Sequence, residues 1–251
     1  MLALVIDTSS AAVTAGVADI GGVDNGGVAE LQPGSVTPPV TVLAERVTVD
    51  ARAHGELLSP SVKACLAEAG LRLTDLDAII AGVGPGPFTG LRVGLVTAAA
   101  MADALGLPSY AVCSLDAIGA ARPDVGSLLV AGDARRKEVY WARYRSGARE
   151  GEPAVAKPAD LPAIALTCSA MAGAGARLYE SVLGLPLIDA DYPTVAGLAG
   201  IAAERLPAGV GTAPSQPLTP LYLRRPDAVA PAGRKQVSQP TTGPTGQRAG
   251  S

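Results

Sequence analysis

The sequence predicts an α/β fold built from two successive blocks, each of which begins with strands and continues with alternating helices and strands. Short apolar runs alternate with stretches whose apolar residues recur at helical spacing. The order of elements partly restarts after Arg122–Pro123, which indicates a duplicated architecture. Apolar residues make up 48% of the 251-residue chain and aromatic residues only 3%, so the core must be aliphatic. We expect lobes at 1–122 and 123–228, the second being smaller.

The first lobe opens with a predicted hairpin. The apolar runs Leu2–Asp7 and Val13–Asp19 flank the turn Thr8–Ser10. Val40–Val49 alternates and is rich in Val and Thr, which predicts a third strand. The intervening segment 20–39 carries five glycines and three prolines and is expected to be a loop.

A helix is predicted next, over 55–69, ending by Gly70. Its apolar stripe comprises Leu57, Leu58, Val62, Cys65, Leu66 and Ala69. Two starts remain open. Ser59–Pro60 can supply an N-cap and a first-turn proline, or the helix begins near Gly55 and Pro60 kinks it.

Three more elements and a short helix complete the first lobe. Asp77–Ala81 reads as a buried strand, Thr89–Leu105 as a helix, and Pro108–Cys113 as another strand. Ser114 is expected to cap the short helix, which ends at Ala121.

The second lobe is predicted to start with a hairpin formed by Ser127–Ala131 and Glu138–Arg145 around the tip Asp133–Lys137 (DARRK). The basic tip is either a solvated turn or a polar contact to a partner or RNA. The later elements are expected to be a strand at Ala163–Cys168, a helix at Ala174–Leu183, a strand at Leu187–Ala190 and a helix at Thr194–Leu206. Residues 229–251 have little to bury and are expected to form a disordered tail.

Charge and cysteine usage limit the function classes. The net charge is −3 and the pI about 5.2, so the chain lacks the basic field that holds nucleic acid unaided. Cys65, Cys113 and Cys168 are isolated, which argues against disulfides or a zinc site and fits a reducing compartment. We see no signal peptide and no uninterrupted apolar run long enough to span a membrane, and we expect a cytoplasmic protein.

The glycine-rich stretch GVGPGPFTGLRVGL at 82–95 invites comparison with phosphate-binding loops. A P-loop requires a lysine after its second glycine, but Gly90 is followed by Leu91. The dinucleotide pattern GxGxxG fails at Pro87. A helix N-terminus can still bind an anion, but we favour a structural turn that positions the following helix.

That following helix is unusually apolar. Between Leu91 and Leu105 only Arg92, Thr97 and Asp103 are polar. One face carries Leu91, Leu95, Ala98, Met101, Ala102 and Leu105. Val93, Val96 and Ala100 recur at helical spacing away from that face. The helix is therefore either a central core helix or a helix with one face in this chain and the other on a second protein, and we favour the second interpretation.

His54 is the only histidine of the chain. A second metal ligand one helical turn later would stand at Leu58, which cannot ligate, and Glu56 points to another side of the helix. No G-x-S-x-G elbow is present for a Ser-His-Asp triad. We therefore expect no bound metal and no such triad, and nothing in these residues predicts a cofactor.

Several motifs together resemble one protein family. The matching stretches are LALVIDTSSAAVTAGV at 2–17, ARAHGELLSPSV at 51–62, GVGPGPFTGLRVG at 82–94, CSLDAIG at 113–119, DARRKEVYWARY at 133–144 and PLYLRRPDA at 220–228. They are similar to the TsaB (YeaZ) family, the partner of the enzyme that makes threonylcarbamoyladenosine beside the tRNA anticodon. Segment 20–39 and the tail after 228 depart from the family pattern.

The resemblance implies the actin/hexokinase-like (ASKHA) fold of two duplicated lobes with mixed sheets flanked by helices. It also implies a non-catalytic relative of TsaD, because Leu58 replaces the second histidine of the TsaD metal motif. The turn Asp7–Ser9 likewise lacks the glycine of the phosphate-binding turn of this fold. The expected role is to bind a TsaD-like catalytic subunit and hold it in an active arrangement. A TsaE-like ATPase joins the assembly, TsaC supplies the threonylcarbamoyl-adenylate, and tRNA is met only through the complex.

The resemblance places the partner interface on the helices 55–69 and 89–105. The residues expected there are Leu57, Leu58, Ser61, Val62, Cys65, Thr89, Arg92, Val93, Val96 and Ala100. A homodimer of the chain alone remains open. The rival hypotheses are a stand-alone nucleotide-dependent kinase or ATPase of the same fold, which the failed phosphate motifs disfavour, and a metallopeptidase, which the single histidine disfavours.

Overall fold

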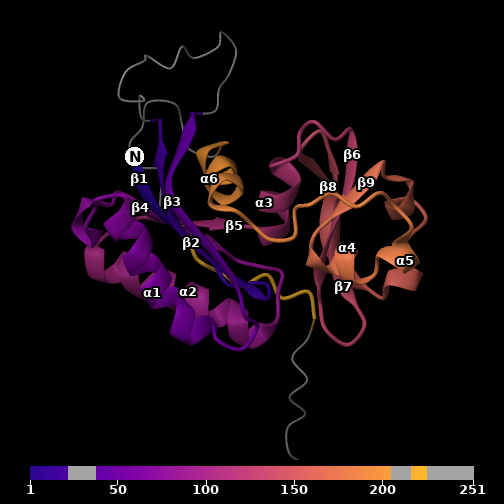
Figure 1. Ribbon diagram of the computed structural model, residues 1–251, viewed down its shortest axis with the longest axis horizontal. Coiled ribbons are helices and arrows are strands. Elements are labelled where there is room, and N and C mark those ends of the chain that lie inside the picture. The colour runs from indigo at the N-terminus through magenta and orange to yellow at the C-terminus, as the bar shows by residue number, and fades with distance from the viewer. Residues whose placement is uncertain (22–37, 205–215, 225–251) are drawn as a thin grey trace, which may run out of the picture.

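The computed structural model describes residues 1–21, 38–204 and 216–224. They form two lobes, each built on its own mixed sheet with helices on its faces (Figure 1). This is the α/β class, with the actin/hexokinase-like arrangement that the family resemblance implies.

The first sheet has five strands in the order β3-β2-β1-β4-β5. Their bounds are β1 Leu2–Asp7, β2 Ala12–Ile20, β3 Val40–Val49, β4 Ala78–Gly82 and β5 Ser109–Val112. β1 pairs antiparallel with β2, which confirms the predicted hairpin, and parallel with β4. β1 is covered on both faces, and for that reason its sequence LALVI is apolar throughout instead of alternating.

Helices cover both faces of this sheet (Figure 1). α1 (His54–Glu68) and α2 (Phe88–Leu105) lie on one face, against a core that includes Leu4 and Ile6. α6 (Val195–Glu204) lies on the other face with Ala3 and Val5. α3 (Ser114–Ala120) stands between α6 and the second sheet.

The second sheet has four strands in the order β8-β7-β6-β9. Their bounds are β6 Ser127–Asp133, β7 Val139–Arg145, β8 Ala148–Ala156 and β9 Ala170–Ala172. The outer face carries α4 (Ala174–Leu178) and α5 (Glu180–Leu183), and the 3-10 turns are Leu73–Asp75, Pro158–Asp160 and Ala165–Thr167. The hairpin around DARRK is confirmed.

The last described segments return to the first lobe. α6 packs on the first sheet, although the predicted boundary at 122 places it in the second lobe. Segment 216–224 then runs along both lobes. The Leu221 amide donates to the Val83 carbonyl of the first lobe at 2.8 Å, and Arg224 Nη1 donates to the Ala134 carbonyl of the second at 3.2 Å.

Several sequence predictions need correction. α1 begins at His54, so Pro60 lies inside the helix and the start at 60 is wrong. Ala163–Cys168 contains a 3-10 turn in place of a strand, and Leu187–Ala190 contributes only a bridge from Leu187 to Met171. The helix predicted over Ala174–Leu183 is interrupted at Tyr179. β8 was not predicted. Most of the 20–39 loop, Leu206 and the tail lie outside the described residues.

Candidate functional site

The turn between β1 and β2 lies at the carboxyl end of β1, where α/β sheets commonly bind ligands. Asp7 is 1% exposed, and hydroxyl and amide groups of this chain bind its carboxylate. Oδ1 accepts from the Ser9 amide at 2.8 Å and the Ser9 hydroxyl at 2.7 Å, while Oδ2 accepts from the Ser114 hydroxyl at 2.5 Å. The carboxylate is thus used to join the turn to α3.

The buried setting of Asp7 changes its protonation. Desolvation raises the pKa of this carboxyl above its ordinary value, and the hydrogen bonds from Ser114 and Ser9 together with the charge of His54 offset part of that rise. The protonated form is therefore favoured in the folded chain relative to the unfolded one.

Thr8 joins the same turn to α2. Its hydroxyl donates to the Gly90 carbonyl at 2.7 Å and accepts from the Gly94 amide at 2.8 Å. These are the two groups that an uninterrupted helix pairs with each other. A side chain at position 94 would collide with the Thr8 hydroxyl, which explains the glycine there.

The glycine-rich loop closes over the turn from the other side. A Cβ at Gly82 would meet the Asp7 carboxylate, and one at Gly86 would meet the Ser9 carbonyl. The cavity between this region and the second lobe, lined in part by Ser9, Ser114 and Asp133, has a volume of only about 30 Å³. Small-molecule sites usually occupy about 300–1,000 Å³, so this cavity is too small for a nucleotide.

His54 is buried at the start of α1 and faces the same turn. Its Nε2 lies 2.8 Å from the Ser10 carbonyl, which can only accept, so Nε2 carries the proton and donates. One helical turn later Leu58 is 1% exposed and belongs to the core. Across residues 1–21, 38–204 and 216–224, no three His, Cys, Asp or Glu side chains are grouped to hold a metal.

The predicted interface residues separate into two groups. Leu58, Val62 and Cys65 are 0–2% exposed and Ser61 is 8% exposed, because this side of α1 faces the sheet. These four are core residues and not surface residues, which corrects their placement at an interface.

The remaining six residues have access to solvent. Thr89, Arg92, Val96 and Ala100 are exposed, and Leu57 and Val93 are half-buried. Val96 is 66% exposed, the largest fraction among the exposed large apolar side chains of the described residues. We call Leu57, Val93, Val96 and Ala100 the α1–α2 surface. The burial of Leu91, Leu95, Ala98 and Ala102 confirms which face of α2 is internal.

Two aromatic residues flank the start of α2. The rings of Phe88 and Tyr222 stack with centroids 5.2 Å apart, and the Arg92 guanidinium lies 3.6 Å from the Phe88 centroid. Arg92 Nε also donates to the Tyr222 hydroxyl at 2.9 Å. This cluster attaches segment 216–224 to the helix. Sequence reasoning missed Phe88 and Tyr222, although both lie in motifs that carry the family resemblance.

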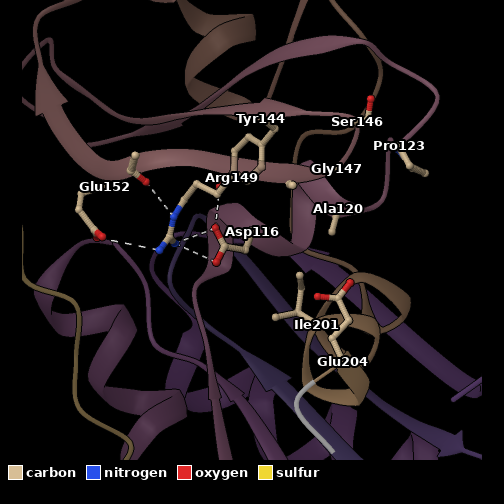
Figure 2. Close-up of a pocket in the computed structure, with 12 residues that line it drawn as sticks. Asp116, Ala120, Pro123, Tyr144, Ser146, Gly147, Arg149, Glu152, Ile201 and Glu204 are labelled. Atoms are coloured by element: carbon tan, nitrogen blue, oxygen red, sulfur yellow. Dashed lines mark hydrogen bonds and ion pairs between the residues drawn. The ribbon is translucent and has the colours of Figure 1, made fainter. Parts of the chain in front are cut away.

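A larger cavity, of about 730 Å³, lies between α3, α6 and the β7–β8 hairpin (Figure 2). On its floor the Asp116 carboxylate accepts from the Tyr144 hydroxyl at 2.8 Å and from Arg149 Nη1 at 2.9 Å on each oxygen. Burial is the largest cause of the raised pKa of Tyr144. These groups satisfy one another, so the cluster ties α3 to the second sheet.

One helix among the described residues, α2, is long and apolar enough to cross a membrane by length and composition alone. The sequence expectation was that no segment qualifies. In the structure the inner side of α2 packs on the first sheet through Leu91, Leu95 and Ala98. A core helix that packs within a lobe can meet the same test of length and composition, so this result alone is weak evidence for a membrane span.

Comparisons with known proteins agree on one family. A family model described as TsaD, tRNA N6-adenosine threonylcarbamoyltransferase, matches residues 41–204. An uncharacterized protein of Mycobacterium leprae is 48% identical over 228 residues, which cover 90% of this chain and 56% of that protein. The chain therefore spans little more than half of that relative. The Escherichia coli protein named tRNA threonylcarbamoyladenosine biosynthesis protein TsaB is 40% identical over 115 residues, which cover 43% of this chain and 50% of that protein.

Solved structures give the same result. A Pseudomonas aeruginosa protein described as similar to peptidase YEAZ superposes with a TM-score of 0.67 at 28% identity, covering 89% of this chain and 99% of that one. YeaZ from Pseudomonas aeruginosa gives a TM-score of 0.61 at 26% identity, covering 80% and 91%. The chain belongs to the TsaB (YeaZ) family of TsaD-like proteins.

Proposed function

We propose that the chain is a non-catalytic subunit of the assembly that makes N6-threonylcarbamoyladenosine in tRNA, and that it binds and activates a TsaD-like catalytic subunit. A TsaE-like ATPase joins the same assembly. The observation that carries the proposal is the exposed apolar side of α2, in a chain whose E. coli relative is named for this biosynthesis. Location in the cytoplasm follows as part of the proposal.

The α1–α2 surface is suited to a protein partner. Between Arg92 and Asp103 the helix carries no charged residue, so its outer side offers apolar area with no charge to desolvate. The inner side is held by the sheet and by the Thr8 hydroxyl, so the surface is presented by a rigid element. Burying a valine such as Val96 contributes about 1.5 kcal/mol or more to association.

The state of the cleft supports a non-catalytic role. The groups that would face a phosphate, namely the Asp7 carboxylate and the Thr8 and Ser9 hydroxyls, are bonded within the chain. The cavity of about 30 Å³ argues against the rival kinase or ATPase, and the engaged Nε2 of His54 argues against the rival metallopeptidase.

The test is Val96→Glu. An unpaired carboxylate buried in the complex costs several kcal/mol, which weakens association on the order of a hundredfold or more. We expect loss of binding to the TsaD-like subunit, measured by calorimetry, and loss of tRNA modification. The thermal midpoint of the free chain should remain unchanged, because position 96 is exposed.

The matched control is Val182→Glu on α5, which is 52% exposed and lies on the other lobe. It introduces the same charge and should leave association intact. Normal binding of Val96→Glu would show that the α1–α2 surface is not the interface. Sedimentation of the free chain, with and without Val96→Glu, also tests whether this surface closes a homodimer when the partner is absent.

A further inference from the structure

β3 (Val40–Val49) is the edge strand of the first sheet, and within residues 1–21, 38–204 and 216–224 no strand pairs with its outer side. An edge presents unpaired backbone N–H and C=O groups, so proteins usually keep edge strands short or charged. β3 is 10 residues long, and it is the one described strand with large apolar side chains in exposed positions. These side chains are Val42, Leu43, Val47 and Val49. Such a strand is suited to pair with another strand.

A bulge decides on which face of the sheet each β3 side chain lies. The register with β2 shifts between Val17 and Ala18, so Leu43 is the extra residue of β3. Residues directly opposite each other on antiparallel strands share a face. Ala44 therefore belongs to the core under α1, whereas Val42 lies opposite Ala18 on the face covered by α6. The valines of β3 on the α6 face are Val40, Val42, Val47 and Val49.

The sequence of β3, VTVLAERVTV, is self-complementary, because it begins and ends with Val-Thr-Val. When two copies lie antiparallel with a two-fold axis at Glu45, Ala44 of one copy faces Arg46 of the other. Because Leu43 is an extra residue, the pairs further out are Val42 with Val47, Thr41 with Thr48 and Val40 with Val49. In each of these pairs both side chains lie on the same face, where β-branched residues pack well across strands.

The two charged residues near this axis have partners within their own chain. Glu45 Oε1 accepts from the Val195 amide at the start of α6 at 2.5 Å, so the carboxylate is held toward α6, where the helix dipole favours it. Arg46 forms an ion pair with Glu68 of α1 at 2.7 Å. Both side chains thus point to the faces of the sheet, and neither loses its partner when the edge is covered.

We propose that two copies of this chain associate through β3, antiparallel and with Val42 of one copy opposite Val47 of the other. The two first sheets then become one continuous sheet. A second copy fits this edge because the strand sequence is complementary to itself. The contact is isologous and closes at two copies, since the opposite edge of the sheet is β5, which has 4 residues and is largely buried. The inference does not depend on the proposed function, and it uses a surface other than the α1–α2 surface.

The first test is Val47→Lys, followed by sedimentation of the purified chain over a series of concentrations. A charge placed opposite Val42 of the other copy has no counter-charge, so association should weaken at least about tenfold. The variant should keep the thermal midpoint of the monomer, because Val47 is 41% exposed. The matched control is Val96→Lys on α2, at another exposed valine, which should leave the dimer intact.

The second test fixes the register by exchanging charges. Val42→Glu alone should also weaken association, but combined with Val47→Lys it places a carboxylate opposite an ammonium at both ends of the contact. Association should then recover to within about threefold of the unmodified chain. Positions 42 and 47 of one chain are roughly 15 Å apart along the strand, so they do not compensate each other within a monomer. Val40→Glu combined with Val47→Lys should not recover, because Val40 faces Val49.

Hydrogen exchange of the unmodified chain gives a measurement that needs no variant. Amides within 40–49 should become more protected as the protein concentration rises, because pairing satisfies them. A chain that stays monomeric up to its solubility limit overturns the inference. So does a dimer that Val96→Lys dissociates and Val47→Lys does not, which would place the second copy on the α1–α2 surface. Failure of the charge exchange to restore association overturns the proposed pairing.

Discussion

α2 and α6 lie on opposite faces of the same sheet, and both are strongly apolar. In α6 the buried residues are Val195, Gly197, Leu198, Ala199, Ile201, Ala202 and Ala203, which leave almost no side free. In the longer α2 only Leu91, Gly94, Leu95, Ala98 and Ala102 are buried. The difference lies in the neighbours: α6 lies between the sheet and α3, whereas α2 has the sheet on one side and no element of the described chain over Val96.

The comparison shows that an apolar composition predicts that a helix is buried but does not identify the element or partner that buries it. In α6 the burying element is α3, which Gly197 allows to approach closely. In α2 the described residues leave part of the apolar surface, including Val96, uncovered. Under the proposed function this uncovered part is the partner surface, and four further variants test the contrast between the two helices.

The largest effect is expected from Leu198→Glu in α6. Leu198 is 0% exposed, and a carboxylate placed there has no counter-charge to pair with, so a cost of several kcal/mol should unfold the chain. Circular dichroism during thermal melting measures it. A folded Leu198→Glu protein would show that this side of α6 tolerates a charge, which would contradict the difference in burial between α6 and α2.

A smaller effect of either sign is expected at the two interior glycines of α6. Gly197→Ala would push a methyl group against the Ala117 carbonyl and should destabilise by about 1–3 kcal/mol. Gly200 has nothing within 4 Å of the added Cβ, so Gly200→Ala should stabilise by about 0.5–1 kcal/mol through helix propensity. Urea denaturation of both variants gives the two values. Equal effects would contradict the close contact between α3 and α6.

The smallest effect concerns the turn that supports α2. Burial raises the folded-state pKa of Asp7, so its contribution to stability is fully present below the unfolded pKa and is lost as pH rises through the folded pKa. Asp7→Asn does not titrate. The unfolding free energy of the unmodified chain relative to this variant should therefore fall from acid toward neutral pH. A difference that stays constant across that range would show that Asp7 is not shifted.

The first lobe could be predicted closely because its signals are local. β1 and β3 have the predicted bounds, since each reads as a single apolar or alternating run. In the second lobe, β8 has the sequence AREGEPAVA and is an edge strand in which only Pro153 is buried. It therefore carries little hydrophobic pattern and is recognisable only by its pairing with β7. The apolar run at Ala163–Cys168 follows Pro162 and supplies core residues from a 3-10 turn, which a strand pattern does not distinguish.

The candidate site was only partly predictable, because some of its features are local and others depend on contacts between residues distant in sequence. The exposed position of Val96 follows from helical periodicity, which is a local property. The role of Ser114 does not: its hydroxyl was expected to cap α3, whereas it donates to Asp7, 107 residues earlier, and accepts from the Gly84 amide. The stack of Phe88 with Tyr222 likewise joins residues distant in sequence, so no sequence pattern announces it.

The position of α6 also determines when the first lobe can be completed during synthesis. Its sheet is fully translated by Val112, but the face that contains Ala3, Val5 and Ile80 is covered only after α6 ends at Glu204. At roughly 5–20 residues per second, that interval lasts about 5–20 seconds. During this time the nascent chain carries an open apolar sheet face. The chain thus depends on α6, near the end of its described residues, to protect its first strands, and a truncation before α6 would expose them to aggregation.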